Sequence, residues 1–304
     1  MKLEALPDSK RKASPDDWHE FAWDGVSFEV PGDWNLSAHG AERDVSSVTM
    51  EDDYAVRLQA EWFVPGRKLK VERLKSRYDK HVAGFGRKAM RTEEIAGLPG
   101  GWMGHVYGMK DAGALAVVFH ADSAGRMAFL ALIHFPDKSN RDPAFVSRRL
   151  ASSFKLHQGP VVPWRFYDVA FELDREFRLA STDFVAGRKH MVFEWQLRKL
   201  SLWFFSLADR VLNGQKPEEW AVDFLNKHPA LKGPHFGLDR KRGAVTAKRS
   251  RLYPLGHFEE IGRACFRYHV TVRHDRAANT VMVRVFNYRK DSDLSLIRHG
   301  NAAK

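Results

Sequence analysis

The sequence of 304 residues contains a single cysteine, Cys265. One cysteine excludes an intrachain disulfide and any CxxC pair that binds a metal or carries redox chemistry. A chain without disulfides is typical of a reducing compartment, so we expect a cytoplasmic protein.

Long apolar segments are also lacking. The longest run, MAFLALIHF at residues 127–135, is far shorter than the ~20 residues that cross a bilayer. The N-terminal residues MKLEALPDSKRKASPDDWHE contain no apolar core of signal-peptide length. We therefore interpret residues 1–17 as a polar leader and predict no membrane insertion.

Local motifs for known chemistries are absent too. No HExxH or Cys/His spacing predicts zinc, and no GxSxG predicts a nucleophilic serine. The glycine-rich stretch GLPGGWMG at residues 97–104 lacks the Lys-Ser/Thr ending of a phosphate loop, so we interpret it as a turn that enters a strand. Cys265 lies near Arg263 and Arg267, which could activate its thiol, but a packed cysteine explains it better. We predict no metal, no cofactor and no catalytic residue. An active site assembled from residues far apart in the sequence is the alternative that these motifs do not test.

Positive charge is concentrated in the second half. The chain has 49 Lys+Arg against 38 Asp+Glu and a net charge of +11. Residues 1–157 hold 23 basic and 22 acidic residues, and residues 158–304 hold 26 and 16, which gives +1 and +10. Such asymmetry favours an anionic partner for the second half, while general basicity without a specific partner is the alternative.

Two similar phrases, DGVSFEVPGDWNLSA from residue 24 and YDVAFELDREFRLAS from residue 167, lie 143 positions apart. Apolar residues alternate with polar ones in both, which predicts half-buried strands. The paired positions include Val26 with Val169, Phe28 with Phe171, and Trp34 with Phe177.

The later segments correspond as well. Both halves contain a strand (residues 55–63 and 199–207), then an amphipathic helix, then a hairpin (residues 114–135 and 267–288). The first half closes with a helix at residues 141–154, whereas DSDLSLIRHGNAAK leaves room for a turn or two in the second. We place the boundary in HQGPVVPW, residues 157–164. The sequence therefore predicts an α+β protein with two similar domains, 18–157 and 158–304, each a mainly antiparallel sheet flanked by helices, the second with a shortened C-terminal helix.

This order of elements, with FEVPGDWNL (28–36) and VSRRLASSF (146–154), resembles the PsbP-like fold. That fold is shared by PsbP of photosystem II, a nuclear import factor that binds the Ran GTPase, and bacterial DcrB-like proteins. The resemblance implies binding of other macromolecules without catalytic residues, and some DcrB-like members are cytoplasmic chaperones of secreted toxins. The tandem arrangement and the shortened second copy depart from the family pattern.

One face of the second hairpin differs from the first. Tyr268, Val270 and Val272 keep the apolar character of Leu115, Val117 and Phe119. On the opposite parity, small apolar residues of the first hairpin are replaced by polar or basic ones, and this face is expected to meet water or a partner. The predicted binding residues are Arg267, His269, Arg273 and Arg284, extended by Arg240, Lys241 and Arg242 in DRKRGAVTAKRSR (239–251).

These observations favour a non-enzymatic binding or adaptor protein that recognises an acidic protein surface through the second domain. A DcrB-like chaperone of a secreted effector is an alternative, and nucleic-acid binding by the same patch is another. An ordinary solvated face is the interpretation that requires no partner.

Overall fold

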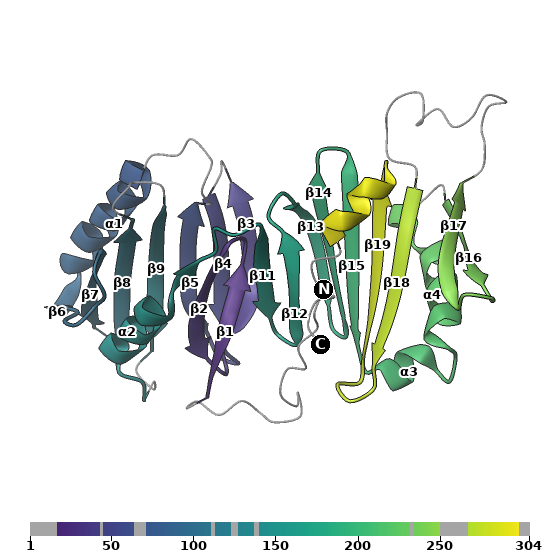
Figure 1. The fold of residues 1–304 in the computed structure, drawn as a ribbon. Helices are drawn as coiled ribbons and strands as arrows, with labels where there is room; N and C mark the ends of the chain where they lie inside the picture. The colour runs from purple at the N-terminus through teal and green to yellow at the C-terminus, as the bar shows by residue number, and fades with distance from the viewer. Residues whose placement is uncertain are drawn as a thin grey trace. The chain divides into compact units, whose positions relative to one another are not determined.

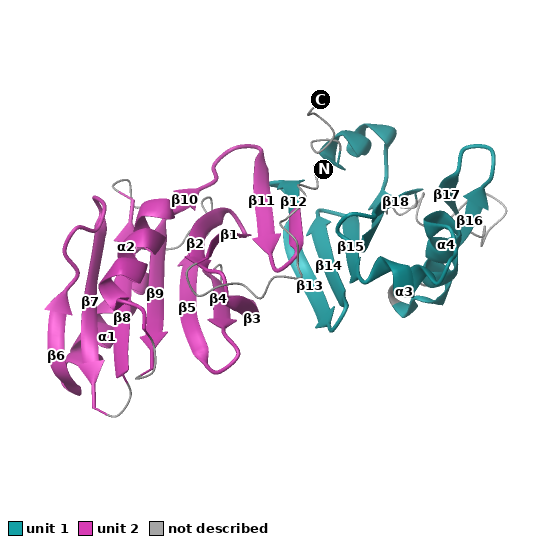
Figure 2. Ribbon diagram, turned by 90° about the horizontal axis from the view of Figure 1, so that it is seen from below, with its two compact units in different colours: residues 1–9, 171–304 teal, residues 10–170 magenta. Residues whose placement is uncertain are grey.

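The computed structural model describes residues 17–42, 45–63, 71–110, 113–122, 127–136, 140–231, 234–249 and 267–297. Contacts divide the chain into two compact units (Figure 2): residues 10–170, here called the N-terminal unit, and residues 171–304 with residues 1–9, here called the C-terminal unit. The division falls within β12 (Val169–Asp174). The domain limits inferred from the sequence, 18–157 and 158–304, stay a prediction.

Antiparallel sheets with a few helices make up both units (Figure 1), which confirms the α+β class. The larger sheet of the N-terminal unit has the order β3-β4-β5-β9-β8-β7-β6. Its strands are β3 (Asn35–Glu42), β4 (Val45–Glu51), β5 (Val56–Phe63), β6 (Ala89–Glu94), β7 (Trp102–Met109), β8 (Gly113–Ala121) and β9 (Ala128–Phe135).

Helix α1 (Val71–Gly86) covers one face of this sheet. Its buried residues Leu74 and Tyr78 pack in one cluster with Leu115, Val117 and Phe119 of β8. The alternation predicted for this hairpin is therefore confirmed, since these three residues share the face that meets a helix.

Helix α2 (Pro143–Ser153) lies on the opposite face, where it contacts β7, β8 and β9. Asp142 caps the helix through a hydrogen bond from the backbone N–H of Ala144 (3.0 Å), as the Asp-Pro start predicts. Beneath it Ala116 and Val118 are fully buried. Because both faces of β8 are covered, the strand is apolar on both parities.

A smaller sheet has the order β10-β2-β1-β11-β12. The turn between β1 and β2 places Asp24 and Gly25 at positive φ (43° and 86°), a conformation that Asp-Gly adopts readily. Phe28 packs on Phe129 of the larger sheet with ring centroids 5.6 Å apart. The remaining strands of this sheet are β1 (Trp18–Trp23), β2 (Val26–Pro31), β10 (Lys155–Leu156) and β11 (Val161–Phe166).

The main sheet of the C-terminal unit has the order β13-β14-β15-β19-β18. A separate pair, β16-β17, contacts β18 through β17. These strands are β13 (Arg178–Val185), β14 (Arg188–Trp195), β15 (Arg198–Ser206), β16 (Pro234–Asp239), β17 (Ala244–Arg249), β18 (Arg267–Asp275) and β19 (Thr280–Tyr288).

The two larger sheets share the same strand order over five strands. The order β3-β4-β5-β9-β8 in the N-terminal unit matches β13-β14-β15-β19-β18 in the C-terminal unit. Strands β3 and β13 begin 143 residues apart (178 − 35), and so do β4 and β14 (188 − 45). The closing elements differ, because α2 has eleven residues and the corresponding segment is the 3-10 helix η2 (Asp291–Ile297).

Candidate functional site

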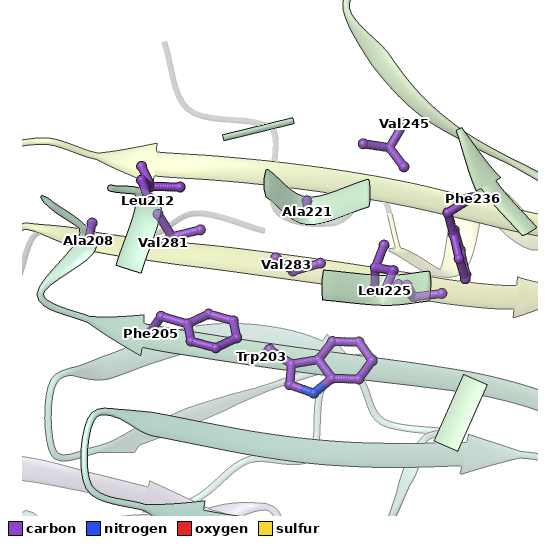
Figure 3. Packing of buried hydrophobic residues seen from close by; sticks show 11 residues of the cluster. Trp203, Phe205, Ala208, Leu212, Ala221, Leu225, Phe236, Val245, Val281 and Val283 are labelled. Atoms are coloured by element: carbon purple, nitrogen blue, oxygen red, sulfur yellow. The ribbon is translucent and has the colours of Figure 1, made fainter. Parts of the chain in front are cut away.

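The hairpin β18–β19 carries the predicted binding residues, and its two faces have different chemistry. One face packs toward α4 (Pro217–Lys227), preceded by the short α3 (Ala208–Leu212). Figure 3 shows Val281 and Val283 of β19 beside Leu212, Ala221 and Leu225 of these helices. Tyr268, Val270 and Val272 of β18 pack against the same cluster. The apolar parity predicted for this hairpin is therefore confirmed.

The other face holds Arg267, His269, Thr271 and Arg273 of β18, with Arg284 opposite Thr271 on β19. We call these five residues the basic face. Arg267, His269 and Arg273 are exposed, and Thr271 and Arg284 are half-buried. Alternation along β18 thus brings three of the seven predicted residues onto one surface, and pairing with β19 adds a fourth, Arg284.

Arg240, Lys241 and Arg242 lie elsewhere, in the turn between β16 and β17. All three are exposed. Asp239 holds the turn by accepting hydrogen bonds from the backbone N–H groups of Lys241 (3.0 Å) and Arg242 (3.3 Å). Residues 250 and 251 of the predicted basic stretch, and Cys265, lie outside the described residues.

Helix η2 supplies carboxylates to arginines of this unit. Asp291 forms an ion pair with Arg267 of the basic face at 2.7 Å, and both side chains are largely exposed. Asp293 is buried and binds Arg198 of β15 at 2.8 Å. Neither aspartate was predicted to take part in this surface, although the spacing Asp-x-Asp, three residues after the end of β19, was visible in the sequence.

Asp293 also fixes the start of η2. Its second carboxylate oxygen accepts hydrogen bonds from the backbone N–H groups of Arg289 (3.1 Å) and Lys290 (3.0 Å). Burial alone would raise the pKa of Asp293, but the hydrogen bonds from Arg198 and from these N–H groups outweigh burial and hold the pKa below its usual value. The carboxylate is therefore charged at neutral pH.

Arg284 has no carboxylate partner within the described residues. Its Nη1 donates to the backbone oxygen of Ile297 (3.2 Å) and its Nη2 donates to Thr271 Oγ1 (3.0 Å). Burial, with a smaller contribution from the charge of Arg273, lowers the pKa of Arg284 to about 10. The guanidinium still carries its charge at neutral pH.

The described residues contain no group of three or more His, Cys, Asp or Glu side chains able to hold a metal ion. Within the same part of the chain, no helix is both long and apolar enough to span a membrane.

No protein-family model matches the chain, and no curated protein matches it. Among solved structures, the chain is similar to the solution structure of cyanobacterial PsbP (CyanoP) from Synechocystis sp. PCC 6803. The identity is 15%, the TM-score is 0.29, and the match covers 48% of this chain and 96% of that one. The PsbP-like fold therefore stays a prediction from the sequence resemblance.

Proposed function

We propose that the protein is a non-enzymatic binding protein whose C-terminal unit recognises an acidic protein partner through the basic face. The observation that carries the proposal is the exposed row of Arg267, His269 and Arg273 along one side of β18. Arginine side chains along a strand speed association with an acidic surface and favour it over neutral surfaces.

The aromatic residues of the hairpin favour a protein over a nucleic acid. Single-stranded nucleic acids bind to sheets by stacking bases on exposed rings. Phe286 and Tyr288 are buried, and Tyr268 packs on the α4 side. The described part of the hairpin therefore offers positive charge without an exposed Phe, Tyr or Trp ring on the basic face.

The turn of β16 and β17 adds to the positive potential of the unit. Arg240, Lys241 and Arg242 are exposed, and β17 contacts β18. We assign these residues to steering of the partner, since charges at the margin of an interface change association rates more than final affinity.

The proposal includes a PsbP-like fold for each unit. The matching strand order of the two larger sheets supports it, together with the family-like phrases of the sequence. An experimental structure of the whole chain tests this part, and different strand orders in the two units would contradict it.

A binding assay tests the function. Fluorescence anisotropy would follow a labelled Asp/Glu-rich peptide binding to the full chain, with single-stranded DNA and RNA of equal length as competing ligands. The double variant His269→Glu, Arg273→Glu should bind the peptide at least about tenfold more weakly, about 1.4 kcal/mol, since it places like charges opposite the peptide. The variant Lys80→Glu changes an exposed lysine of α1 and should bind normally.

Two results would contradict the proposal. The first is peptide binding that is unchanged in the double variant. The second is preferential binding of DNA or RNA with steep weakening by salt, which would assign the face to nucleic acid.

A further inference from the structure

Arg284 of the basic face has hydrogen-bonding capacity that its described partners do not use. A guanidinium has five N–H groups. The described partners of Arg284, Ile297 O and Thr271 Oγ1, accept two of them, and both acceptors are uncharged. Its Nε is buried and has no acceptor.

Neighbouring arginines of the same unit show a different environment. Arg198 and Arg267 each bind an aspartate of η2 at 2.8 and 2.7 Å. No ion pair joins Arg284 to a carboxylate in the described part of the chain, and the nearby charge that acts on it is the positive charge of Arg273. A half-buried charge without a counter-ion opposes folding, so a role that requires an anion explains its presence better than packing does.

The sheet itself does not require an arginine at this position. In the N-terminal unit Ala131 of β9 pairs with Ala60 of β5, and in the C-terminal unit Arg284 of β19 pairs with Leu202 of β15. Both alanines are buried, which shows that an apolar residue satisfies the equivalent place in the sheet. On β19 the residues Met282 and Phe286, which share the face of Arg284, are also buried.

We propose that Arg284 is an anion-binding subsite that takes one carboxylate of the acidic partner, with Arg273 as a second cation and Thr271 as the hydroxyl that orients the guanidinium. This inference rests on the proposed function. The planar guanidinium matches a carboxylate in shape, and its single uncompensated charge matches a carboxylate's single negative charge.

Acetate serves as the probe, with the full chain and no partner. Melting temperatures are measured in sodium acetate, sodium phosphate and sodium chloride at equal ionic strength. The wild-type chain should show a saturable rise of about 2 °C or more in acetate over chloride, since a ligand that binds only the folded state stabilises it. The variant Arg284→Met should lose this rise and should melt no lower than wild type in chloride. Arg284→Lys should retain part of the rise.

Arg267→Met is the matched control, because Arg267 already has the carboxylate of Asp291. This variant should keep the acetate response. The proposal is wrong if wild type shows no acetate-specific rise, or if Arg284→Met keeps that rise. It is also wrong if Arg284→Met fails to fold while Arg284→Lys folds without an acetate response. The positive charge at position 284 would then serve only to hold η2 through the backbone oxygen of Ile297. A response to phosphate without one to acetate would assign the subsite to a phosphate group.

The same variants separate this inference from the proposed function. Peptide binding that depends on His269 and Arg273 but is unchanged in Arg284→Met would retain the function and overturn the subsite. An acetate response that depends on Arg284, combined with peptide binding that ignores the basic face, would retain the subsite as a small-anion site and overturn the function.

Discussion

The imidazole of His190 lies flat on the indole of Trp203, with ring centroids 4.3 Å apart and ring planes 3° apart. His228, at the end of α4, meets the same pair edge-on at 5.5 Å from His190 and 5.1 Å from Trp203. The Nε2 atom of His190 is buried and lacks a hydrogen-bond partner. The C-terminal end of α4 therefore packs on a cluster whose burial favours the neutral form of His190.

Acid should weaken the C-terminal unit through this residue. Burial, followed by the charge of His228, lowers the pKa of His190 from 6.5 to about 4. Between pH 6.5 and pH 4 the unfolded chain binds a proton at His190 that the folded chain does not bind. The free energy of unfolding is therefore unaffected by His190 above pH 6.5 and decreases as the pH falls from 6.5 through 4. The loss is on the order of 3 kcal/mol. Urea unfolding of His190→Phe, which keeps the aromatic stack, should show less destabilisation between pH 7.5 and pH 4.5 than wild type.

Met191 provides the control for this prediction. It is a buried neighbour on β14 that binds no proton. Met191→Leu should change the free energy of unfolding by the same amount at both pH values. Parallel pH dependence of His190→Phe and wild type would contradict the prediction.

The two aspartates of η2 should contribute unequally to stability. Asp293→Ala removes the buried partner of Arg198 and the acceptor of two backbone N–H groups, so the free energy of unfolding should fall by about 3 kcal/mol. Asp291→Ala removes an exposed ion pair with Arg267 and should cost less than about 1 kcal/mol. Urea denaturation at pH 7 measures both. Equal losses would show that the burial of Asp293 has no energetic consequence.

Gly104 of β7 should not tolerate a side chain. A Cβ at this position would lie 2.9 Å from Val118 Cγ1, 3.0 Å from the backbone oxygen of Val117 and 3.1 Å from Ile95 Cδ1. Gly104→Ala should therefore destabilise the N-terminal unit by about 1–3 kcal/mol, since the packed sheet must shift. A Cβ added at Gly237 in β16 would have no other residue's atom within 4 Å, apart from its chain neighbours. Gly237→Ala should therefore change the free energy of unfolding by less than about 0.5 kcal/mol. Thermal unfolding distinguishes them, and an equally stable Gly104→Ala variant would refute the prediction.

Local signals in the sequence predicted much of the fold. Alternation of apolar residues and clusters of turn residues can each be recognised within about ten consecutive positions. These two signals predicted both hairpins, β8–β9 and β18–β19. Asp142 followed by Pro143 located the start of α2. The offset of 143 residues anticipated the matching positions of β3 and β13.

Contacts between distant segments were not predicted. Alternation indicates which face of β18 a side chain occupies, but it does not reveal what approaches that face. The ion pair of Arg267 with Asp291 and the hydrogen bond from Arg284 to Ile297 arise because η2 folds back beside the hairpin. A 3-10 helix of seven residues has too few turns to show a periodic apolar pattern. Residues 239–251 were interpreted as an extension of the basic patch, and the β16–β17 turn and β17 that they form were not predicted.

The strand order has a consequence for synthesis on the ribosome. In the N-terminal unit β3, β4 and β5 follow one another and pair locally, but the next strand in the sheet is β9, which starts at Ala128. In the C-terminal unit, β15 likewise pairs with a distant strand, β19, which starts at Thr280. Closing such long loops costs entropy that local hairpins avoid. The third strand of each meander therefore emerges with one edge unpaired, and that edge stays unpaired until the distant hairpin has been translated.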